Sequence, residues 1–223
     1  MKLITIFAIG ITQMAISKTK SKHDDSAELK IKMAARIVFH KKGFAAARTR
    51  DIAREAGINL ALLNYYFRSK EKLFDLIMLE TLQTFFQSMA MVFNDETTTL
   101  EEKVAVIADK YIDLLLEEPE IPIFLLNELR GNPTALLKKF NVKKVVANSV
   151  LLRQWQQTMK ENKLPPMHPL HFMANLMALV IFPFIGSPML KTIGSMNEDQ
   201  FKKMMLERKA LIPVWIRSML KAK

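Results

Sequence analysis

The sequence predicts an all-α protein with two parts, a small three-helix domain followed by a larger helical domain. Apolar residues recur at helical spacing from the start, as in Leu29, Met33 and Ile37. Half of the residues are hydrophobic, yet only 6 of 223 are glycine, which disfavours a turn-rich all-β fold and long disordered segments. Polar or proline-containing breaks separate the periodic segments.

Capping and stop residues set the expected helix ends. Thr49 and Ser69 are expected to cap the second and fourth helices, Gly43 to end the first, and Pro213 to bend the last. Pro183 and Pro188 are expected to interrupt the apolar segment that begins at Pro169. The helices expected on this basis span residues 26–42, 49–56, 60–67, 70–93, 100–117, 121–130, 134–162, 169–182 and 198–220.

Residues 47–73 have the pattern of a helix-turn-helix. Gly57 tolerates the positive φ of a tight turn between two short helices, and the small Ala53 lets the second helix approach closely. Leu63 and Phe67 are four residues apart and can face the first helix. An ordinary helical hairpin inside an all-α core would satisfy the same spacing.

The outer face of the second short helix is unusual because it lacks charge. Lysine and glutamate are typical of a solvated helix, whereas the residues here are short, amide or phenolic. Such side chains suit the floor of a DNA major groove and its phosphate walls. The residues left on or near this face are Leu60, Ala61, Leu62, Asn64, Tyr65 and Tyr66.

Positive charge is concentrated around this motif. Residues 18–72 hold 14 Lys or Arg against 6 Asp or Glu, whereas residues 73–223 hold 18 against 16. This distribution favours a polyanionic partner for the N-terminal part. The chain has no cysteine, which excludes disulfides, thiolate nucleophiles and thiolate zinc sites.

The first 17 residues form an apolar run behind Lys2 that is similar to a secretory signal and too short to span a bilayer as a helix. Export would separate a DNA-binding module from DNA, so we expect Met14 to be the true start, followed by a basic arm from Lys18 to Lys22. A membrane-tethered form is the alternative. Residues 1–25 are treated as an N-terminal extension.

The full string around the motif closely resembles the DNA-binding domain of the TetR family of bacterial transcriptional regulators. The resemblance rests on Asp51-Ile-Ala-Arg-Glu-Ala-Gly-Ile58 and Tyr65-Tyr-Phe-Arg-Ser-Lys-Glu-Lys-Leu73, preceded by Phe39-His-Lys-Lys-Gly-Phe44. It is strong over residues 29–78 and extends to helix layout alone beyond them. It implies a helix-turn-helix DNA-binding domain over 26–72 and a helical effector-binding and dimerisation domain over 73–223.

The resemblance also implies roles for individual residues. Thr49, Tyr66 and Lys70 match phosphate-contacting positions. Base-reading or groove-lining positions correspond to Arg50, Asn59, Leu60, Ala61 and Tyr65. Asn64 stands where the family usually has tyrosine, so a common phosphate contact is lost or replaced by an amide. The implied partners are a double-stranded DNA operator and a second copy, bound through about 169–183 and 198–220.

A small apolar or aromatic effector is expected in the second domain, and the protein is expected to be a cytoplasmic, ligand-responsive repressor without cofactor, metal or membrane contact. His168 and His171 are three residues apart, but Pro169 breaks the intervening turn. No catalytic constellation or phosphate-binding glycine loop is present in the sequence. The open alternatives are a basic membrane-surface protein and a helical enzyme. The expected pocket residues are Met89, Phe93, Tyr111, Phe124, Leu125, Trp155 and Met177.

Overall fold

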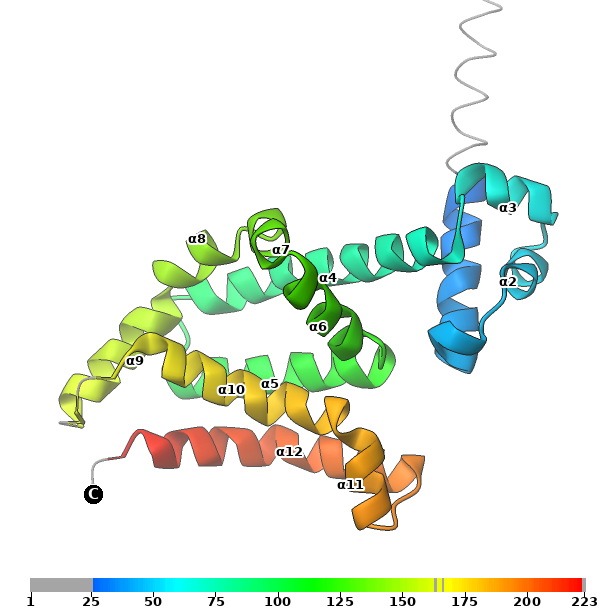
Figure 1. Ribbon diagram of the computed structural model, residues 1–223. Helices are drawn as coiled ribbons and strands as arrows, with labels where there is room; N and C mark the ends of the chain where they lie inside the picture. Colours follow the sequence, from blue (N-terminus) through cyan, green and yellow to red (C-terminus); the bar gives the residue numbers. More distant parts are fainter. Residues whose placement is uncertain (1–25, 163, 166, 222–223) are drawn as a thin grey trace, which may run out of the picture. The chain divides into compact units, whose positions relative to one another are not determined.

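The computed structural model describes residues 26–162, 164–165 and 167–221, and helices without strands make up its regular structure over these ranges (Figure 1). The predicted all-α class is confirmed. The chain forms two compact units, one ending at Leu79 and one beginning at Glu80. The predicted start at Met14 and the arm from Lys18 to Lys22 lie outside the described residues, and the functional division at residue 72 stays a prediction.

The first unit is built on a helical segment over residues 26–46, on α2 (Thr49–Glu55) and on α3 (Leu60–Tyr66). Gly43 and Gly57 have φ values of 70° and 65°, the conformation that favours glycine. Gly57 lies in the predicted turn, but the helix end expected at Gly43 is wrong, because the helical segment continues to residue 46. The core of this unit contains fully buried Ile31, Ile52 and Leu63. Leu63 therefore faces inward from α3 as its spacing predicts.

The caps of these short helices differ in part from the prediction. Thr49 was expected to cap α2, and this is wrong: Arg48 is the N-cap residue, its side chain makes no capping hydrogen bond, and Thr49 is already helical. Asn59 caps α3 instead, with its side-chain oxygen accepting a hydrogen bond from the Leu62 backbone over 2.8 Å. Ser69 caps the next helix as expected, because its hydroxyl accepts from the Lys72 backbone over 3.2 Å.

Helix α4 (Lys70–Asn94) begins in the first unit and ends in the second. The second unit continues with α5 (Leu100–Glu117) and α6 (Ile121–Gly131). A capping box at Thr99 and Glu102 starts α5, and Pro122 lies in the first turn of α6, where a missing backbone N–H costs nothing. These three helices have the predicted bounds to within a residue.

The single helix predicted over 134–162 is wrong. The structure has three helices there, α7 (Pro133–Lys139), α8 (Val142–Ala147) and α9 (Val150–Glu161). Asn141 adopts a left-handed φ of 52°, which a continuing α-helix does not allow. Ser149 then caps α9 by accepting from the Leu152 backbone. Asparagine tolerates the left-handed region better than most residues, so the break coincides with a residue type that permits it.

The prolines near residue 183 also act differently from the prediction. Helix α10 (Pro169–Ile185) continues through Pro183, and a further helix, α11 (Ser187–Ile193), follows with Pro188 in its first turn. Pro188 thus starts a helix rather than ending one. The last helix, α12 (Glu198–Met219), contains Pro213 and packs against α5 and α10 (Figure 1).

By length and hydropathy α4 is able to cross a membrane, as are α10 and α11 together if their 69° bend is accepted within one span. Core helices of globular proteins meet the same two criteria. The finding therefore does not by itself favour the membrane-surface alternative.

Candidate functional site

The helix-turn-helix presents most of the predicted DNA-binding residues at its surface. Arg50, Asn59, Ala61, Asn64 and Tyr65 are exposed, and Tyr65 is the extreme case at 76%. The remaining four predicted residues are half-buried and come from both short helices and from the start of α4. These are Thr49, Leu60, Tyr66 and Lys70.

The two tyrosines of α3 are in contact. The rings of Tyr65 and Tyr66 pack edge to face with their centroids 5.3 Å apart. Tyr66 also lies beside buried Phe67. The Tyr66 phenol is therefore half-buried beside Phe67, whereas the Tyr65 phenol is exposed to solvent.

The Lys70 side chain is half-buried, and its ammonium group makes hydrogen bonds within the first unit. Its ammonium group donates to the carbonyl oxygens of Phe44 and Ala47 over 2.9 and 3.1 Å. It also lies 4.3 Å from the centroid of the Phe44 ring. An ammonium has three N–H donors, so one remains for a DNA phosphate.

Asp51 is a positioning residue that the sequence did not single out. Its carboxylate accepts from Lys42 over 2.7 Å and from Arg54 over 2.9 Å, so it connects the first helical segment to α2. The hydrogen bond from Lys42 is the main reason why the pKa of Asp51 lies below its ordinary value. The spacing of nine residues between Lys42 and Asp51 lies outside any helical rule, which explains why sequence reasoning missed the pair.

The second unit contains a cavity of about 310 Å³ within the described residues. It is lined by α4 and α5, by α6 to α8, and by α10. Tyr111 alone among the lining residues has a polar side-chain atom. The lining residues are Phe86, Met89, Phe93, Tyr111, Leu125, Leu129, Leu136, Leu137, Phe140, Val142, Val145, Val146, Met173, Met177 and Ile181.

Five of the seven expected pocket residues line this cavity, namely Met89, Phe93, Tyr111, Leu125 and Met177. Phe124 and Trp155 do not. Phe124 is buried on α6, and the ring of Trp155 stacks on Phe172 with centroids 5.9 Å apart. Tyr111 lines the cavity, and burial raises the pKa of its hydroxyl well above its ordinary value.

Sequence reasoning missed the wall formed by α7 and α8. The cavity is lined by Leu136 and Leu137 from the first of these helices, by Phe140 at its C-terminal cap, and by Val142, Val145 and Val146 from the second. The prediction placed them in the middle of one long helix. A signal was available in Asn141, since asparagine is among the few residues that enter the left-handed region routinely.

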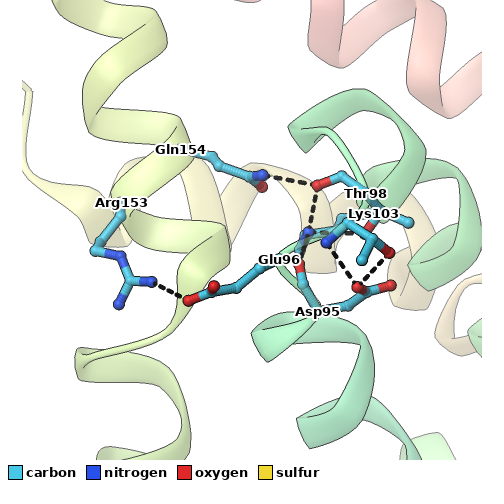
Figure 2. A network of polar contacts seen from close by, with 7 residues as sticks. Asp95, Glu96, Thr98, Lys103, Arg153 and Gln154 are labelled. Carbon is cyan, nitrogen blue, oxygen red and sulfur yellow. Dashed lines mark hydrogen bonds and ion pairs between the residues drawn. The ribbon is translucent and has the colours of Figure 1, made fainter.

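A polar network lies at the end of α4 (Figure 2). Fully buried Lys103 donates to the backbone oxygens of Asp95 and Thr98 over 2.5 and 2.7 Å, and to the Thr98 hydroxyl over 2.8 Å. From α9, Gln154 donates to the Thr98 carbonyl and Arg153 pairs with Glu96. The loop between α4 and α5 is therefore fastened to both α5 and α9.

Burial of Lys103 lowers the pKa of its ammonium group. Carbonyl and hydroxyl oxygens accept the hydrogen bonds of that group. Over the described part of the chain, no three His, Asp or Glu residues lie close enough together to hold a metal ion.

Comparison with known proteins relates the helix-turn-helix to bacterial transcriptional regulators. Residues 31–77 match the family model described as "Bacterial regulatory proteins, tetR family". The HTH-type transcriptional repressor NicS of Pseudomonas putida is 33% identical over 112 residues, which cover 49% of this chain and 51% of that protein. The Bacillus subtilis protein named "Probable HTH-type transcriptional regulator YttP" is 23% identical over 199 residues, covering 86% of this chain and 93% of its own length.

Solved structures share the fold over most of the chain. The transcriptional regulator FadR from Bacillus subtilis, crystallised in complex with stearoyl-CoA, superposes with a TM-score of 0.53 at 19% identity, over 82% of this chain and 96% of that one. A TetR/AcrR-family transcriptional regulator from Thermobifida fusca gives 0.57 at 15% identity, over 83% and 96%. Together with the exposed helix-turn-helix, these findings identify the chain as a DNA-binding transcriptional regulator whose residues 31–77 match the TetR family.

Proposed function

We propose that the protein is a ligand-responsive repressor that binds a palindromic operator as a homodimer in the cytoplasm. The observation that carries this proposal is the uncharged, exposed face of α3, where Ala61, Asn64 and Tyr65 lie within a unit rich in positive charge. Base edges are read by small, amide and phenolic groups, while surrounding lysines and arginines neutralise phosphates.

A dimer is supported by exposed apolar side chains on two neighbouring helices. Leu170 and Phe182 on α10 are 65% and 55% exposed, and Val214 on α12 is 50% exposed. Exposed apolar residues that gather on adjacent elements are typical of interfaces. The proposed interface therefore comprises about 169–183 and 198–220, and two recognition helices would enter successive major grooves roughly 34 Å, or a multiple of this distance, apart.

An apolar effector is supported by the cavity. Its volume of about 310 Å³ lies at the lower end of the range for small-molecule sites, and no lining residue is charged. One protein of the same fold was crystallised with stearoyl-CoA, so this fold accommodates a ligand with a long apolar chain. Met89, Met173 and Met177 provide unbranched, adaptable side chains for such a ligand.

The proposal is tested by gel shift with genomic fragments and by light scattering on the same sample. The expected result is retardation of a fragment containing an inverted repeat, with a free protein mass of two chains at micromolar concentration. Flotation with anionic liposomes tests the membrane-surface alternative. A monomer that binds DNA tightly would contradict the proposed dimer. Liposome binding without DNA binding would overturn the proposal that the protein is a DNA-binding regulator.

A further inference from the structure

The wall of the cavity that the sequence did not predict also lies in a strongly basic segment of the second unit. Residues 129–148 hold five basic side chains and no acidic one, whereas the rest of residues 73–223 holds 13 basic and 16 acidic residues. This segment therefore carries a net charge of +5, with no acidic residue of its own to offset it. Its basic residues are Arg130, Lys138, Lys139, Lys143 and Lys144.

These five residues alternate in sequence with residues that line the cavity. Lys138 and Lys139 lie between Leu137 and Phe140, and Lys143 and Lys144 lie between Val142 and Val145. All five basic side chains are exposed. Within the described residues, none of the five takes part in an ion pair.

Two leucines show where the cavity reaches the surface. Leu129 and Leu137 are 39% and 44% exposed, while the other lining residues are buried or half-buried. Each of these leucines is followed directly by a basic residue, Arg130 or Lys138. Lysine and arginine side chains extend along apolar surface with their charge in water, so basic groups can surround an apolar opening without entering it.

The inside of the cavity and its surroundings therefore favour different ends of one ligand. A carboxylate or phosphate placed among the lining residues would lose its hydration with only the Tyr111 hydroxyl to replace it, which is costly. The same anion at the opening would keep water and gain nearby positive charge. A neutral ligand would use the cavity and leave the basic segment without a role.

We propose that the effector is an amphipathic anion, whose apolar chain fills the cavity while its anionic end stays at the opening beside Arg130, Lys138, Lys139, Lys143 and Lys144. This inference rests on the proposed ligand response and specifies its chemistry. Saturated C12 compounds differing only at one end are suitable probes: dodecanoate, dodecanol and dodecylamine.

The experiment is a titration of the full chain with each probe by calorimetry, below the concentration at which the probe forms micelles and at two salt concentrations. Several exposed charge contacts of a few tenths to 1 kcal/mol each would make dodecanoate bind roughly 3- to 30-fold tighter than dodecanol. Dodecylamine should bind most weakly. Added salt should reduce the difference between carboxylate and alcohol because it screens exposed charges.

Variants assign the preference to the basic segment. The combined substitutions Lys138→Gln, Lys139→Gln, Lys143→Gln and Lys144→Gln should remove the preference for dodecanoate and leave dodecanol binding unchanged. Exposed lysines of α5 and α9 provide the matched control, and Lys110→Gln with Lys160→Gln should change the affinity for neither dodecanoate nor dodecanol. Met177→Trp, which fills the cavity, should weaken the binding of all three probes. Thermal unfolding of each variant verifies that it is folded.

Equal affinity for dodecanoate and dodecanol would overturn the inference, as would a preference that survives the four substitutions. Failure of all three probes to bind the wild-type chain would overturn it as well. Loss of DNA affinity by the lysine variant without any probe would show that the segment contacts DNA instead. None of these outcomes alters the gel-shift and light-scattering test of DNA binding and dimerisation, so failure of the inference and failure of the proposed function are distinguishable.

Discussion

The ammonium group of Lys70 donates to the carbonyl oxygen of Phe44 over 2.9 Å and lies 4.3 Å from the centroid of the Phe44 ring. The first residue of α4 is thereby bonded to the end of the first helical segment. Lys70 is also the residue predicted to touch a DNA phosphate. Both roles are compatible because two of its three N–H donors are used internally.

Lys70→Ala should consequently have two effects. Loss of the charge-assisted hydrogen bonds should lower the free energy of unfolding by roughly 1–3 kcal/mol. Loss of a phosphate contact should lower the magnitude of the salt slope of DNA binding by about one unit. Urea unfolding and salt titrations measure the two effects separately. Lys72→Ala, at an exposed position on the same helix, is the control for stability, and an unchanged salt slope in Lys70→Ala would show that Lys70 is purely structural.

Asn59 gives a prediction about base preference. Its side-chain oxygen accepts from the Leu62 backbone over 2.8 Å, so the oxygen faces the helix and the amide nitrogen is directed away from it. A donor at this place favours acceptors of the major groove such as those of guanine or thymine, and disfavours the paired contact by which asparagine reads adenine. Asn59→Asp keeps the cap but replaces the donor by an acceptor.

Selection from a randomised operator library should therefore show a changed preference at one position of each half-site for Asn59→Asp, towards cytosine, whose N4 group donates. Asn59→Ala should lose about 1 kcal/mol of stability with the cap, together with discrimination at that position. A library profile that is the same for all three proteins would mean that Asn59 only caps α3.

Substitutions of Thr49 and Arg50 should distinguish a phosphate contact from a contact with base edges. Because Thr49 does not cap α2, its hydroxyl remains available for a phosphate, and Thr49→Ala should leave stability within about 0.5 kcal/mol of wild type. It should weaken binding to all DNA sequences alike. Arg50→Ala should cost roughly 1–3 kcal/mol on the operator and flatten discrimination at particular base pairs. Competition binding with operator and random DNA measures both, and equal losses on both DNAs for both variants would contradict the assignment.

Lys103 supports the loop that follows α4 (Figure 2). Lys103→Met would keep the apolar stem but leave the half-buried Asp95 carbonyl without this donor, and the Thr98 carbonyl with Gln154 alone as its side-chain donor. The expected loss is roughly 2–4 kcal/mol in the free energy of unfolding, measured with urea. Lys110→Met, at an exposed position of the same helix, should be nearly neutral. If both variants lost the same stability, the buried network would not be the cause.

Local patterns in the sequence predicted the first unit well. Gly57 requires positive φ, and Leu63 and Phe67 follow the helical period, so the turn between α2 and α3 and the inward face of α3 were predictable. The end of the first helical segment was not, because it lies beyond Gly43. The N-cap residue of α2 could not be predicted in the same way. Thr49 and Arg48 are neighbours, and which of them begins the helix depends on how Lys42 and Asp51 pack together.

The second unit was harder because its decisive features are not local. Residues 134–162 have no glycine or proline before Pro165, so they look like one helix, and the break at Asn141 depends on a backbone conformation that asparagine permits but does not require. Trp155 was expected at the cavity by its position in the chain. It packs on Phe172 instead, and no spacing rule relates residues on α9 and α10.

The last prediction concerns control of DNA binding by the cavity. Met89 and Phe93, both on α4, line the cavity, and Lys70 begins the same helix within the helix-turn-helix unit. A ligand that binds the two states of α4 unequally would change DNA affinity, and a typical coupling of roughly 1–3 kcal/mol corresponds to a change of about 5- to 150-fold. Reciprocity then requires that operator DNA weaken ligand binding by the same factor.

Dodecanoate titrated with and without operator should show this reduced affinity. Met177→Trp should bind operator and should not be released from it by dodecanoate. A ligand bound equally well under both conditions would rule out this form of control, because equal affinity for two states shifts neither of them.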